Sequence, residues 1–581
     1  MAVISTLSAA VPKTPLTISA VTLFIIAAIG LLYRALLPKP IPGIPYKKSS
    51  ARRILGDAPD VLRWNKETKE IWSYIRNLAI ELDSPVIQVF MRPLGKPWVI
   101  LCDFREAQDI QMYRSNDFDR ARVLEDIFGS LLPNCHVWMP SNDKFKAHRN
   151  LIRDTMSPAF LNGVVGPVIH AKTQSMLTLW RERARLAQGR PFEGDHDLFR
   201  ATLDVILSAT FELEAGSIAA QTKLLSRLDT IALPADVDTP VEFPTAKDPQ
   251  EFTSIRSLLD SVEIALNSPF PTAHLSFALN FYPELSSARK YKDGMIAERV
   301  QRAWKKFGEN ADQDDKVACA VDLLIQRQAQ MAKKENRNLG YDVQAIKGEL
   351  FGFIAAGHET TSTTICWAVK YLTEYPEVQK KLRSILRATY KRAVDAREPP
   401  TAEEIAKTTI PYLDAFIEES HRCGNTVPTI VRHAIRDTTV LGYKIPKGTD
   451  VFMLTNGPSY QSPAFSVNES ERSKTSHDSK DKFGSWNSSD IHLFIPERWI
   501  VKEQNGEERF DPRAGPAHPY GTGLRGCFGS KFAALELKII ITLILWSFDL
   551  QEIPPPLRGF EGHDKNTKRA QKVFIRLAEV N

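Results

Sequence analysis

Cysteine is scarce in this chain of 581 residues, and its six cysteines lie far apart. No two of them form a CxxC pair, which argues against zinc ribbons and knuckles, and so few cysteines exclude a small secreted fold held by disulfides. Such a pattern is typical of a reducing compartment, where free thiols are buried as small apolar groups. The six are Cys102, Cys135, Cys319, Cys366, Cys423 and Cys527.

An excess of charge of one sign is also missing. The chain has 75 lysines and arginines against 69 acidic residues, a net charge of +6. Nucleic-acid binding would require basic clusters on one face, so the composition does not indicate a nucleic-acid partner. With 43% hydrophobic and 25% charged residues the chain has an ordinary globular composition, and it is long enough to bury a large core.

Long apolar runs are absent except for one near the N-terminus. The segment Thr14–Tyr33 carries no charge and contains an apolar core at Val21–Leu32. A helix needs about 20 residues to cross a bilayer core of about 30 Å. A cleaved signal peptide is the alternative, but its apolar stretch is shorter, at roughly 7–15 residues. We therefore expect an uncleaved transmembrane helix at residues 14–37.

The charges beside this segment predict its orientation. Lys13 precedes it, and six basic residues follow it within a short distance, so the positive-inside rule places residues 1–13 in the lumen and the body in the cytosol. Residues 38–48 contain four prolines and predict an extended, semi-rigid linker. The six basic residues are Arg34, Lys39, Lys47, Lys48, Arg52 and Arg53.

The body, at residues 49–581, is expected to be one mainly helical domain. Helical periodicity predicts helices over Phe145–Met156, Lys172–Leu186, Val343–Tyr375 and Pro376–Ala393, and short strand-like pieces occur at Val440–Ile445 and Val451–Leu454. Residues 461–490 are polar and rich in serine, which predicts an exposed loop insertion. Its two glycosylation sequons, at Asn468 and Asn487, should stay unmodified in the cytosol.

A glycine-rich motif at Pro519–Lys531 allows three interpretations. Its Gly521-Thr-Gly-Leu-Arg-Gly526 matches the dinucleotide pattern GxGxxG, but no strand-like segment precedes it and little chain follows. A phosphate loop requires Gly-Lys-Ser/Thr, whereas the order here is Gly529-Ser-Lys531. The third interpretation is a loop that presents the thiolate of Cys527 at the start of a helix over Ser530–Phe548.

The chemistry favours the third interpretation. A cysteine at a helix N-terminus lies near unpaired N–H donors and the positive end of the dipole, so we expect a lowered pKa for Cys527. Gly526 and Gly529 leave room for backbone N–H groups near the sulfur and for a planar ligand. Arg525 can pair with an anionic ligand edge. These are the requirements of an axial haem ligand.

The motif Tyr520-Gly-x-Gly-x-Arg525-x-Cys527-x-Gly529 resembles the haem-binding loop of the cytochrome P450 superfamily. The resemblance implies a P450 fold, mainly α with small β-sheets, behind the single transmembrane helix. It also implies that haem b (iron protoporphyrin IX) is bound through the sulfur of Cys527. The family usually has phenylalanine where this chain has Tyr520, and the additional hydroxyl needs a hydrogen-bond partner.

A second motif, Ala356-Gly-His-Glu359-Thr360, lies within the expected helix over Val343–Tyr375. Threonine hydroxyls that bond back to carbonyls could merely bend this helix. In the resembled family the helix crosses the distal haem face. The resemblance therefore implies that Gly357 leaves room for the cofactor and that Glu359 and Thr360 deliver protons during O₂ cleavage.

A third set consists of Glu419, Arg422 and Arg498. By itself, an acid and an arginine three residues apart on a helix form a weak surface pair worth about 0.3–0.5 kcal/mol. The resemblance implies instead a buried network of these three residues behind the haem, with a structural role.

Two further arginines are expected at the haem propionates through the resemblance. Arg149 lies on the helix over Phe145–Met156, where the family often has Trp-x-x-x-Arg, and Phe145 replaces the tryptophan. Arg153, one turn later, is the alternative to Arg149. Arg432 corresponds to the arginine expected at the other propionate. Without the resemblance, each would be interpreted as a solvated basic surface residue.

The resemblance implies a monooxygenase in the endoplasmic reticulum membrane that uses O₂ and electrons from an NADPH–cytochrome P450 reductase, with cytochrome b5 as a second candidate donor. Basic residues near the motif, Arg525, Lys531 and Lys538, would steer an acidic partner. Variable segments at 118–128 and 211–252 suggest a lipophilic substrate, and the motifs resemble membrane-bound fungal members of secondary metabolism. The alternatives are a reductase-independent haem-thiolate isomerase or dehydratase, and a catalytically silent binding protein.

Overall fold

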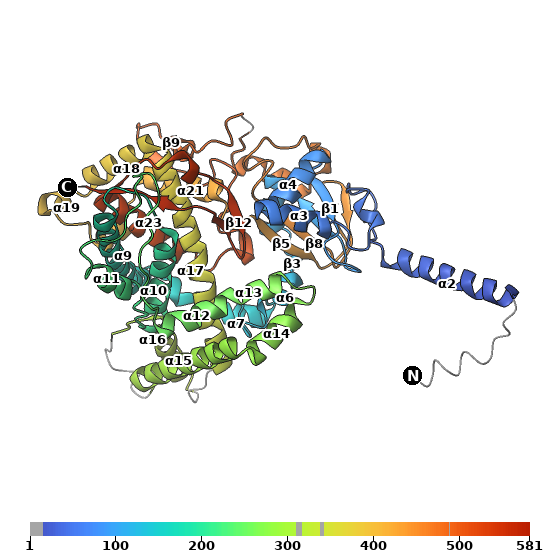
Figure 1. Ribbon diagram of the computed structural model, residues 1–581, viewed down its shortest axis with the longest axis horizontal. Helices are drawn as coiled ribbons and strands as arrows, with labels where there is room; N and C mark the ends of the chain where they lie inside the picture. The colour runs from blue at the N-terminus through green and yellow to red at the C-terminus, as the bar shows by residue number, and fades with distance from the viewer. Residues whose placement is uncertain (1–14, 309–315, 337–341, 487–488, 581) are drawn as a thin grey trace.

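The protein is mainly helical with several small β-sheets, as the sequence predicts. The computed structural model describes residues 15–308, 316–336, 342–486 and 489–580. The long helix α17 (Val343–Glu374) runs through the centre of the helical region (Figure 1). It packs against α10 (Asp195–Phe211), α21 (Pro411–Gly424) and α23 (Ser530–Ser547), and all four helices contribute to the largest apolar core cluster.

Near the N-terminus, helix α2 (Pro15–Leu36) extends away from the body (Figure 1). Its segment Ser19–Leu36 is not buried by the protein, and it is the one described helix long and apolar enough to cross a membrane. The hydroxyl of Tyr33 donates to the carbonyl of Arg52 at 2.6 Å, which ties the end of α2 to the body. The expected start at Thr14 and the whole of residues 1–13 lie outside the described residues.

The proline-rich linker, predicted to be extended and semi-rigid, is docked on the body. Ile41 and Ile44 are buried, at 8% and 2% exposure. The side-chain amide of Gln88 accepts from the Ile41 N–H at 2.8 Å and donates to the carbonyls of Ile41 and Ile44 at 2.9 and 2.8 Å. The composition predicts the extended backbone, but it does not show that Ile41 and Ile44 are buried against the body.

A five-stranded sheet forms the second large unit, with strand order β1-β2-β8-β5-β3. In the antiparallel pair β3–β5, Arg120 lies directly opposite Arg432. Opposite residues share one face of a sheet, so this register places two guanidinium groups side by side. The strands are β1 (Val86–Val89), β2 (Trp98–Leu101), β3 (Phe118–Arg120), β5 (Thr429–Ala434) and β8 (Asp450–Leu454).

The predicted strand Val440–Ile445 is a tight hairpin instead. Strand β6 (Thr438–Val440) pairs with β7 (Tyr443–Ile445) in an antiparallel register. Leu441 and Gly442 between them have φ angles of 46° and 78°. Two consecutive residues in the left-handed region form the turn that matches the twist of a two-residue hairpin. The prediction missed it because Leu441 is not a typical turn residue.

The predicted helices are present with shifted ends. The first is α7 (Asp143–Ile152), which a 3₁₀ turn continues to Met156, and the second is α9 (Gly166–Ala187), which starts earlier than expected. The segment predicted as one helix over Pro376–Ala393 is α18 (Pro376–Thr389) followed by α19 (Lys391–Ala396). The break falls at Tyr390, whose ring is buried.

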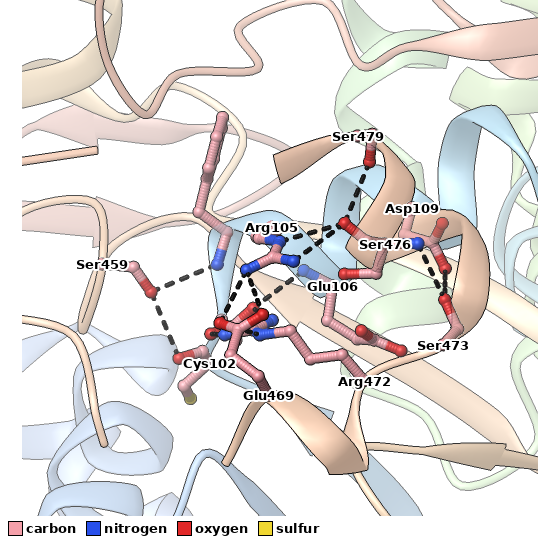
Figure 2. Close-up of polar contacts among 12 residues, drawn as sticks. Cys102, Arg105, Glu106, Asp109, Ser459, Glu469, Arg472, Ser473, Ser476 and Ser479 are labelled. Atoms are coloured by element: carbon pink, nitrogen blue, oxygen red, sulfur yellow. Dashed lines mark hydrogen bonds and ion pairs between the residues drawn. The ribbon is translucent and has the colours of Figure 1, made fainter. Parts of the chain in front are cut away.

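The insertion at 461–490 is not simply an exposed loop. It contains η4 (Glu469–Glu471), α22 (Lys474–Asp478) and η5 (Lys480–Lys482), and it packs on α5 (Phe104–Met112) (Figure 2). Its polar residues serve as helix caps, a role that composition alone did not reveal. The sequon residue Asn468 caps η4 through its side chain, whereas Asn487 lies outside the described residues.

The other elements enclose this framework. The remaining α-helices are α3 (Ala58–Thr68), α4 (Ile71–Glu81), α6 (Arg122–Phe128), α8 (Pro158–Phe160), α11 (Ser217–Leu225), α12 (Gln250–Asp260), α13 (Val262–Leu266), α14 (Pro271–Phe281), α15 (Pro283–Phe307), α16 (Ala320–Lys334) and α20 (Ala402–Lys407). The remaining strands are β4 (Phe192–Glu193), β9 (Ile500–Lys502), β10 (Glu508–Phe510), β11 (Phe548–Leu550), β12 (Gly562–Asp564), β13 (Lys568–Ala570), β14 (Phe574–Ile575) and β15 (Leu577–Glu579).

Candidate haem-thiolate site

A cavity of about 420 Å³ separates the middle of α17 from the glycine-rich loop. Its wall is mostly apolar, with a band of threonines and a group of arginines. The residues that the sequence predicts at a haem site and that line this cavity are Cys527, Arg525, Tyr520, Gly529, Arg149, Arg432, Gly357 and Thr360. The fold thus brings together eight residues from four separate parts of the chain.

The loop from Tyr520 to Cys527 depends on two glycines in the left-handed region. Gly521 has a φ of 60° and Gly523 a φ of 69°, conformations that other residues adopt only with strain. A 3₁₀ turn, η7 (Gly523–Arg525), follows, and the Cys527 N–H donates to the Tyr520 carbonyl at 2.7 Å. Cys527 is the exposed member of the six free cysteines, and its exposure is toward the cavity.

The electrostatic environment of Cys527 differs from the expectation. Burial raises the pKa of the thiol, and this effect outweighs the backbone N–H groups of Gly529 and Ser530, which lower it. The prediction of a lowered pKa was therefore wrong for the protein without its ligand, although the expected donors are present. A bound metal ion would deprotonate the thiol. No strand leads into the loop among residues 511–522, so the dinucleotide interpretation has no structural support.

The hydroxyl of Tyr520 has a hydrogen-bond partner, which the sequence could not identify. It lies 3.1 Å from Nε2 of His421 on α21. Burial lowers the pKa of His421 to about 4, so the imidazole is neutral at physiological pH. Burial also raises the pKa of Tyr520, which keeps the phenol protonated. The ring therefore stays beside the cysteine loop with its polar atom satisfied.

Four guanidinium groups converge at one end of the cavity: Arg120, Arg149, Arg432 and Arg525. Arg525 lies over the ring of Phe145 at 3.8 Å and pairs with Asp119 at 3.2 Å. The phenylalanine that replaces the family's tryptophan thus still supplies an aromatic platform, through a cation–π contact.

This arginine cluster has more positive charge than its surroundings neutralise. Burial, with repulsion from neighbouring arginines, lowers the pKa of Arg120 to about 9 and that of Arg432 to about 10. Nε of Arg120 is buried and has no hydrogen-bond partner among the described residues. Asp119 is the acidic residue paired with the cluster. A ligand with two carboxylates at its edge, as haem has, fits this charge and these donors.

Arg120 is a site residue that the sequence analysis missed, because nothing in Phe118-Asp-Arg120 forms a motif. The structure also distinguishes the two candidates on α7 and the turn after it. Arg149 lines the cavity and donates to the carbonyls of Leu524 and Gly526 at 3.3 and 3.4 Å. Arg153 is 66% exposed and pairs with Asp154. The geometry therefore favours Arg149.

On the opposite wall, Thr360 and Gly357 line the cavity from α17. The hydroxyl of Thr360 donates to the Ala356 carbonyl at 2.8 Å, one turn earlier. A Cβ on Gly357 would lie 3.0 Å from the side chain of Ile206 on α10. The absence of a side chain at Gly357 therefore also serves the packing of α17 on α10, and the room that it leaves for a cofactor stays a prediction.

Glu359 does not line the cavity. Its carboxylate is buried and pairs with Arg569 at 2.9 Å. It also accepts hydrogen bonds from Thr567 at 3.0 Å and Asn566 at 3.3 Å. These partners come from the hairpin β12–β13, which lies far from α17 in the sequence. Burial raises the pKa of Glu359, but Arg569 and the hydrogen bonds outweigh it and the net shift is downward.

The structural network behind the site forms with one change of partner. Arg422 and Glu419 make a bidentate pair at 2.8 and 2.6 Å, both buried. The additional donor to Glu419 is the indole of Trp499 at 2.9 Å. Arg498, which we expected to join Glu419, pairs instead with Asp490 at 3.1 Å and lies over Trp486. The prediction named Arg498, whereas the residue that binds Glu419 is its neighbour Trp499.

The basic residues expected to steer a partner are only partly available. Arg525 is buried within the cavity wall, and Lys538 is paired with Asp414 at 2.8 Å. Lys531, at the start of α23, is exposed. Of these three residues, Lys531 alone is thus placed to meet a partner at the surface.

A second polar cluster on the cavity wall had no signal in the sequence analysis. Glu349 on α17 accepts from Nδ1 of His136 at 2.6 Å and from Nδ1 of His148 at 2.7 Å. It also accepts the backbone N–H of His136 at 2.7 Å. A buried carboxylate needs such partners. This cluster ties the segment before α7 to α17 and closes one side of the cavity.

Comparisons with known proteins agree with this geometry. The Cytochrome P450 family model matches residues 60–466 and 489–566. A cytochrome P450 monooxygenase, GME11363 of Pestalotiopsis microspora, is 48% identical over 97% of this chain and 98% of its own length. The monooxygenase TRI13 of Fusarium sporotrichioides is 34% identical over 96% of this chain and 98% of its own.

A solved structure shares the fold. The haem domain of cytochrome P450DA superposes with a TM-score of 0.62 at 18% identity, covering 94% of this chain and 98% of the other. Family match, relatives and fold therefore lead to one conclusion: the chain belongs to the cytochrome P450 family and is a haem-dependent monooxygenase.

Proposed function

We propose that Cys527 is the axial thiolate ligand of haem b and that Arg120, Arg149, Arg432 and Arg525 hold its propionates. The observation that carries this proposal is the unneutralised arginine cluster at the end of a cavity into which a single exposed cysteine opens. When bound, the haem supplies O₂ activation, so that one oxygen atom enters the substrate and the other leaves as water.

The residues of α17 control protons in this proposal. Thr360 presents its hydroxyl at the cavity wall, where its oxygen can accept a hydrogen bond while its proton is donated to the Ala356 carbonyl. Glu359, the preceding residue, is held by the β12–β13 hairpin. For proton transfer from Glu359 to Thr360, the carboxylate has to leave Arg569. The hairpin thus holds the Glu359 carboxylate outside the apolar cavity until the carboxylate leaves Arg569.

The cavity suits a lipophilic substrate without an acidic group. Most of its wall is apolar, and its arginines are occupied by the propionates in this proposal. Burying an unpaired charge beside them would be costly. We place the reaction, a hydroxylation or a related oxidation, in fungal secondary metabolism, and what supports this is that the relatives are cytochrome P450 monooxygenases of fungi.

Two surface features support attachment to the endoplasmic reticulum membrane. Helix α2 has the length and composition of a span. Around α14 a second apolar area is exposed, at Phe270, Phe277 and Phe281, with exposed fractions of 74%, 54% and 68%. Such aromatic exposure is typical of a surface that meets lipid or another protein. Residues 1–13 would then be lumenal and residues 49–581 cytosolic.

The electron donor in this proposal is a membrane-bound NADPH–cytochrome P450 reductase, with cytochrome b5 as an additional donor. The test uses the full-length chain in fungal microsomes, with extracts of the host's lipophilic metabolites as candidate substrates. Product formation should require NADPH and the reductase. Turnover without either would indicate a reductase-independent haem-thiolate enzyme, and binding spectra without turnover a silent binding protein.

A further inference from the structure

Most of the insertion lies outside the part of the chain that the family model matches. That match stops at residue 466 and resumes at residue 489, so residues 467–488 depart from the common pattern of the family. The described part of the segment is nevertheless capped, since Ser473 accepts the N–H of Ser476 at the start of α22. The described part of the insertion is thus folded and docked on the body.

Its strongest attachment is a buried ion pair with the start of α5. The two terminal nitrogens of Arg472 each donate to one oxygen of Asp103 at 2.9 Å. The side chains are only 8% and 6% exposed. Asp103 is also the N-cap of α5, since it accepts the N–H of Glu106 at 2.8 Å. Arg472 therefore neutralises the residue that starts this helix.

Contacts of Arg105 and of Asp109 also attach the same helix to the insertion (Figure 2). Nη1 of Arg105 on α5 donates to both carboxylate oxygens of Glu469, at 2.8 and 3.0 Å. Its Nε and Nη2 donate to the Ser476 carbonyl. Ser473 donates to Asp109 at 2.6 Å. Residues from the start of α5 to its middle are therefore bound to the insertion.

The charge balance shows why Arg472 matters most. Asp103, Glu106 and Asp109 lie at i, i+3 and i+6 on one face of α5, and all three are buried. Arg114 pairs with Glu106 at 3.1 Å but also pairs with Asp117. Without Arg472, Asp103 would therefore keep a buried charge with no cation of its own, an unfavourable arrangement.

Another part of α5 carries the cysteine loop. Oε1 of Gln111 accepts the Thr522 N–H at 3.1 Å. A Cβ on Gly523 would overlap the Gln111 carbonyl, so the two backbones are in direct contact. At the start of α5, the ring of Phe104 stacks on His518 at 4.5 Å. The loop therefore rests on both ends of this helix.

We propose that residues 467–486 are a brace that sets α5 against the cysteine loop, and that Arg472 is a positioning residue for Cys527. The inference rests on the proposed role of Cys527 as the haem ligand. Arg472 acts through Asp103 and α5 and does not line the haem cavity. The brace would hold the loop that carries the sulfur in place for ligation, as residues outside the ligand set do at other metal sites.

The test compares Arg472→Ala with Lys474→Ala in the full-length haem protein. Lys474 is in the same insertion, but it is 86% exposed and pairs with Asp478 at the surface. The measurement is the rate at which the thiolate-ligated ferrous–CO spectrum is lost, at a temperature well below the melting temperature of each variant. We expect about a tenfold faster loss for Arg472→Ala and a change within about twofold for Lys474→Ala.

A double-variant cycle tests the route through α5. Gln111→Leu removes the contact at the other end and should also speed the loss. If both act through α5, the double variant should be less severe than the product of the single effects. Fully multiplicative effects would overturn the route. If Arg472→Ala does not accumulate, Arg472→Lys replaces it, because this variant keeps the charge but loses the bidentate bond. The same comparison of the rates of spectral loss then tests the brace.

Hydrogen exchange of residues 519–529, measured in parallel, separates this inference from the proposed function. Faster exchange in the Arg472 variant supports the brace, whether or not the wild-type chain shows a thiolate spectrum. A missing thiolate spectrum in the wild-type chain would refute the role of Cys527 but not the brace. Unchanged exchange together with a rate of spectral loss within about twofold of wild type would overturn the brace.

Discussion

Arg120 shows what a single residue contributes to the haem site. It lies opposite Arg432 in the sheet register, and its Nε is buried with no partner among the described residues. A donor in this state has a high desolvation cost unless a ligand satisfies it. In the proposed site a haem propionate would supply the complementary charge and offset that cost.

We therefore expect Arg120→Gln to weaken haem binding. A hydrogen bond to a charged group contributes about 2 kcal/mol, or roughly thirtyfold in affinity. Haem affinity can be measured by titration of the apoprotein. Arg153→Gln is the matched control, because Arg153 is exposed and paired with Asp154. Equal affinity for Arg120→Gln and wild type would remove Arg120 from the site.

A second prediction concerns the acid that we propose as a proton relay. Arg569 lowers the pKa of Glu359 against the effect of burial. In Arg569→Gln the pKa of Glu359 should rise, so the carboxylate becomes protonated at higher pH. If the ionised form accepts the proton to be relayed, the acid limb of the pH–rate profile should move up by about one unit.

Arg576→Gln is the control for this effect, because Arg576 pairs with Asp238 at the surface, away from α17. An acid limb that stays at the same pH in Arg569→Gln, in an enzyme that remains active, would exclude Glu359 as the relay.

At the scale of elements, the cysteine loop depends on glycine backbones. Gly523 has a φ of 69° and touches the backbone of Gln111, so no side chain fits there. Gly189, after α9, has a φ of 78°, but no atom lies within 4 Å of the place that a Cβ would take. The two glycines share the left-handed backbone and differ in the space around them.

Gly523→Ala should therefore cost more than about 2 kcal/mol of stability in the loop and abolish thiolate ligation of the haem. Gly189→Ala should cost only about 1 kcal/mol and leave ligation intact. The two measurements are thermal unfolding and the ferrous–CO spectrum. Intact thiolate ligation in Gly523→Ala would show that the loop tolerates another geometry.

The elements also show where the sequence was informative. Cys527, Thr360 and the Glu419–Arg422 pair could be predicted because each lies in a contiguous motif. Arg120 could not, because it becomes significant only opposite Arg432, a neighbour through the sheet. The contacts of the insertion and of the linker could not be predicted for a similar reason: polar or proline-rich composition does not show that these segments pack on α5 and β1.

At the scale of the whole molecule, buried acids make stability depend on pH. Burial raises the pKa of Asp204 on α10 to about 7, and that of Glu106 on α5 also to about 7. An acid whose pKa is higher in the folded state contributes stability at low pH. That contribution is lost as the pH rises from the unfolded pKa, near 4, through the folded pKa, near 7.

Asp204→Asn should remove its share of this loss. At pH 8 the variant should be more stable than wild type by up to about 4 kcal/mol, and at pH 4 the two should be similar. Chemical denaturation at both pH values checks this. Asp143→Asn is the control, because that side chain is 98% exposed. A variant no more stable than wild type at pH 8 would show that Asp204 is paired.

The proposed activity of the whole molecule depends on one bond between a sulfur atom and iron. The most direct measurement is the ferrous–CO spectrum of the purified full-length chain, beside that of Cys527→Ser. We expect the thiolate-ligated spectrum for the wild type and its complete loss in Cys527→Ser. The same spectrum in both proteins, or its absence from a wild-type chain that has bound haem, would contradict the role of Cys527.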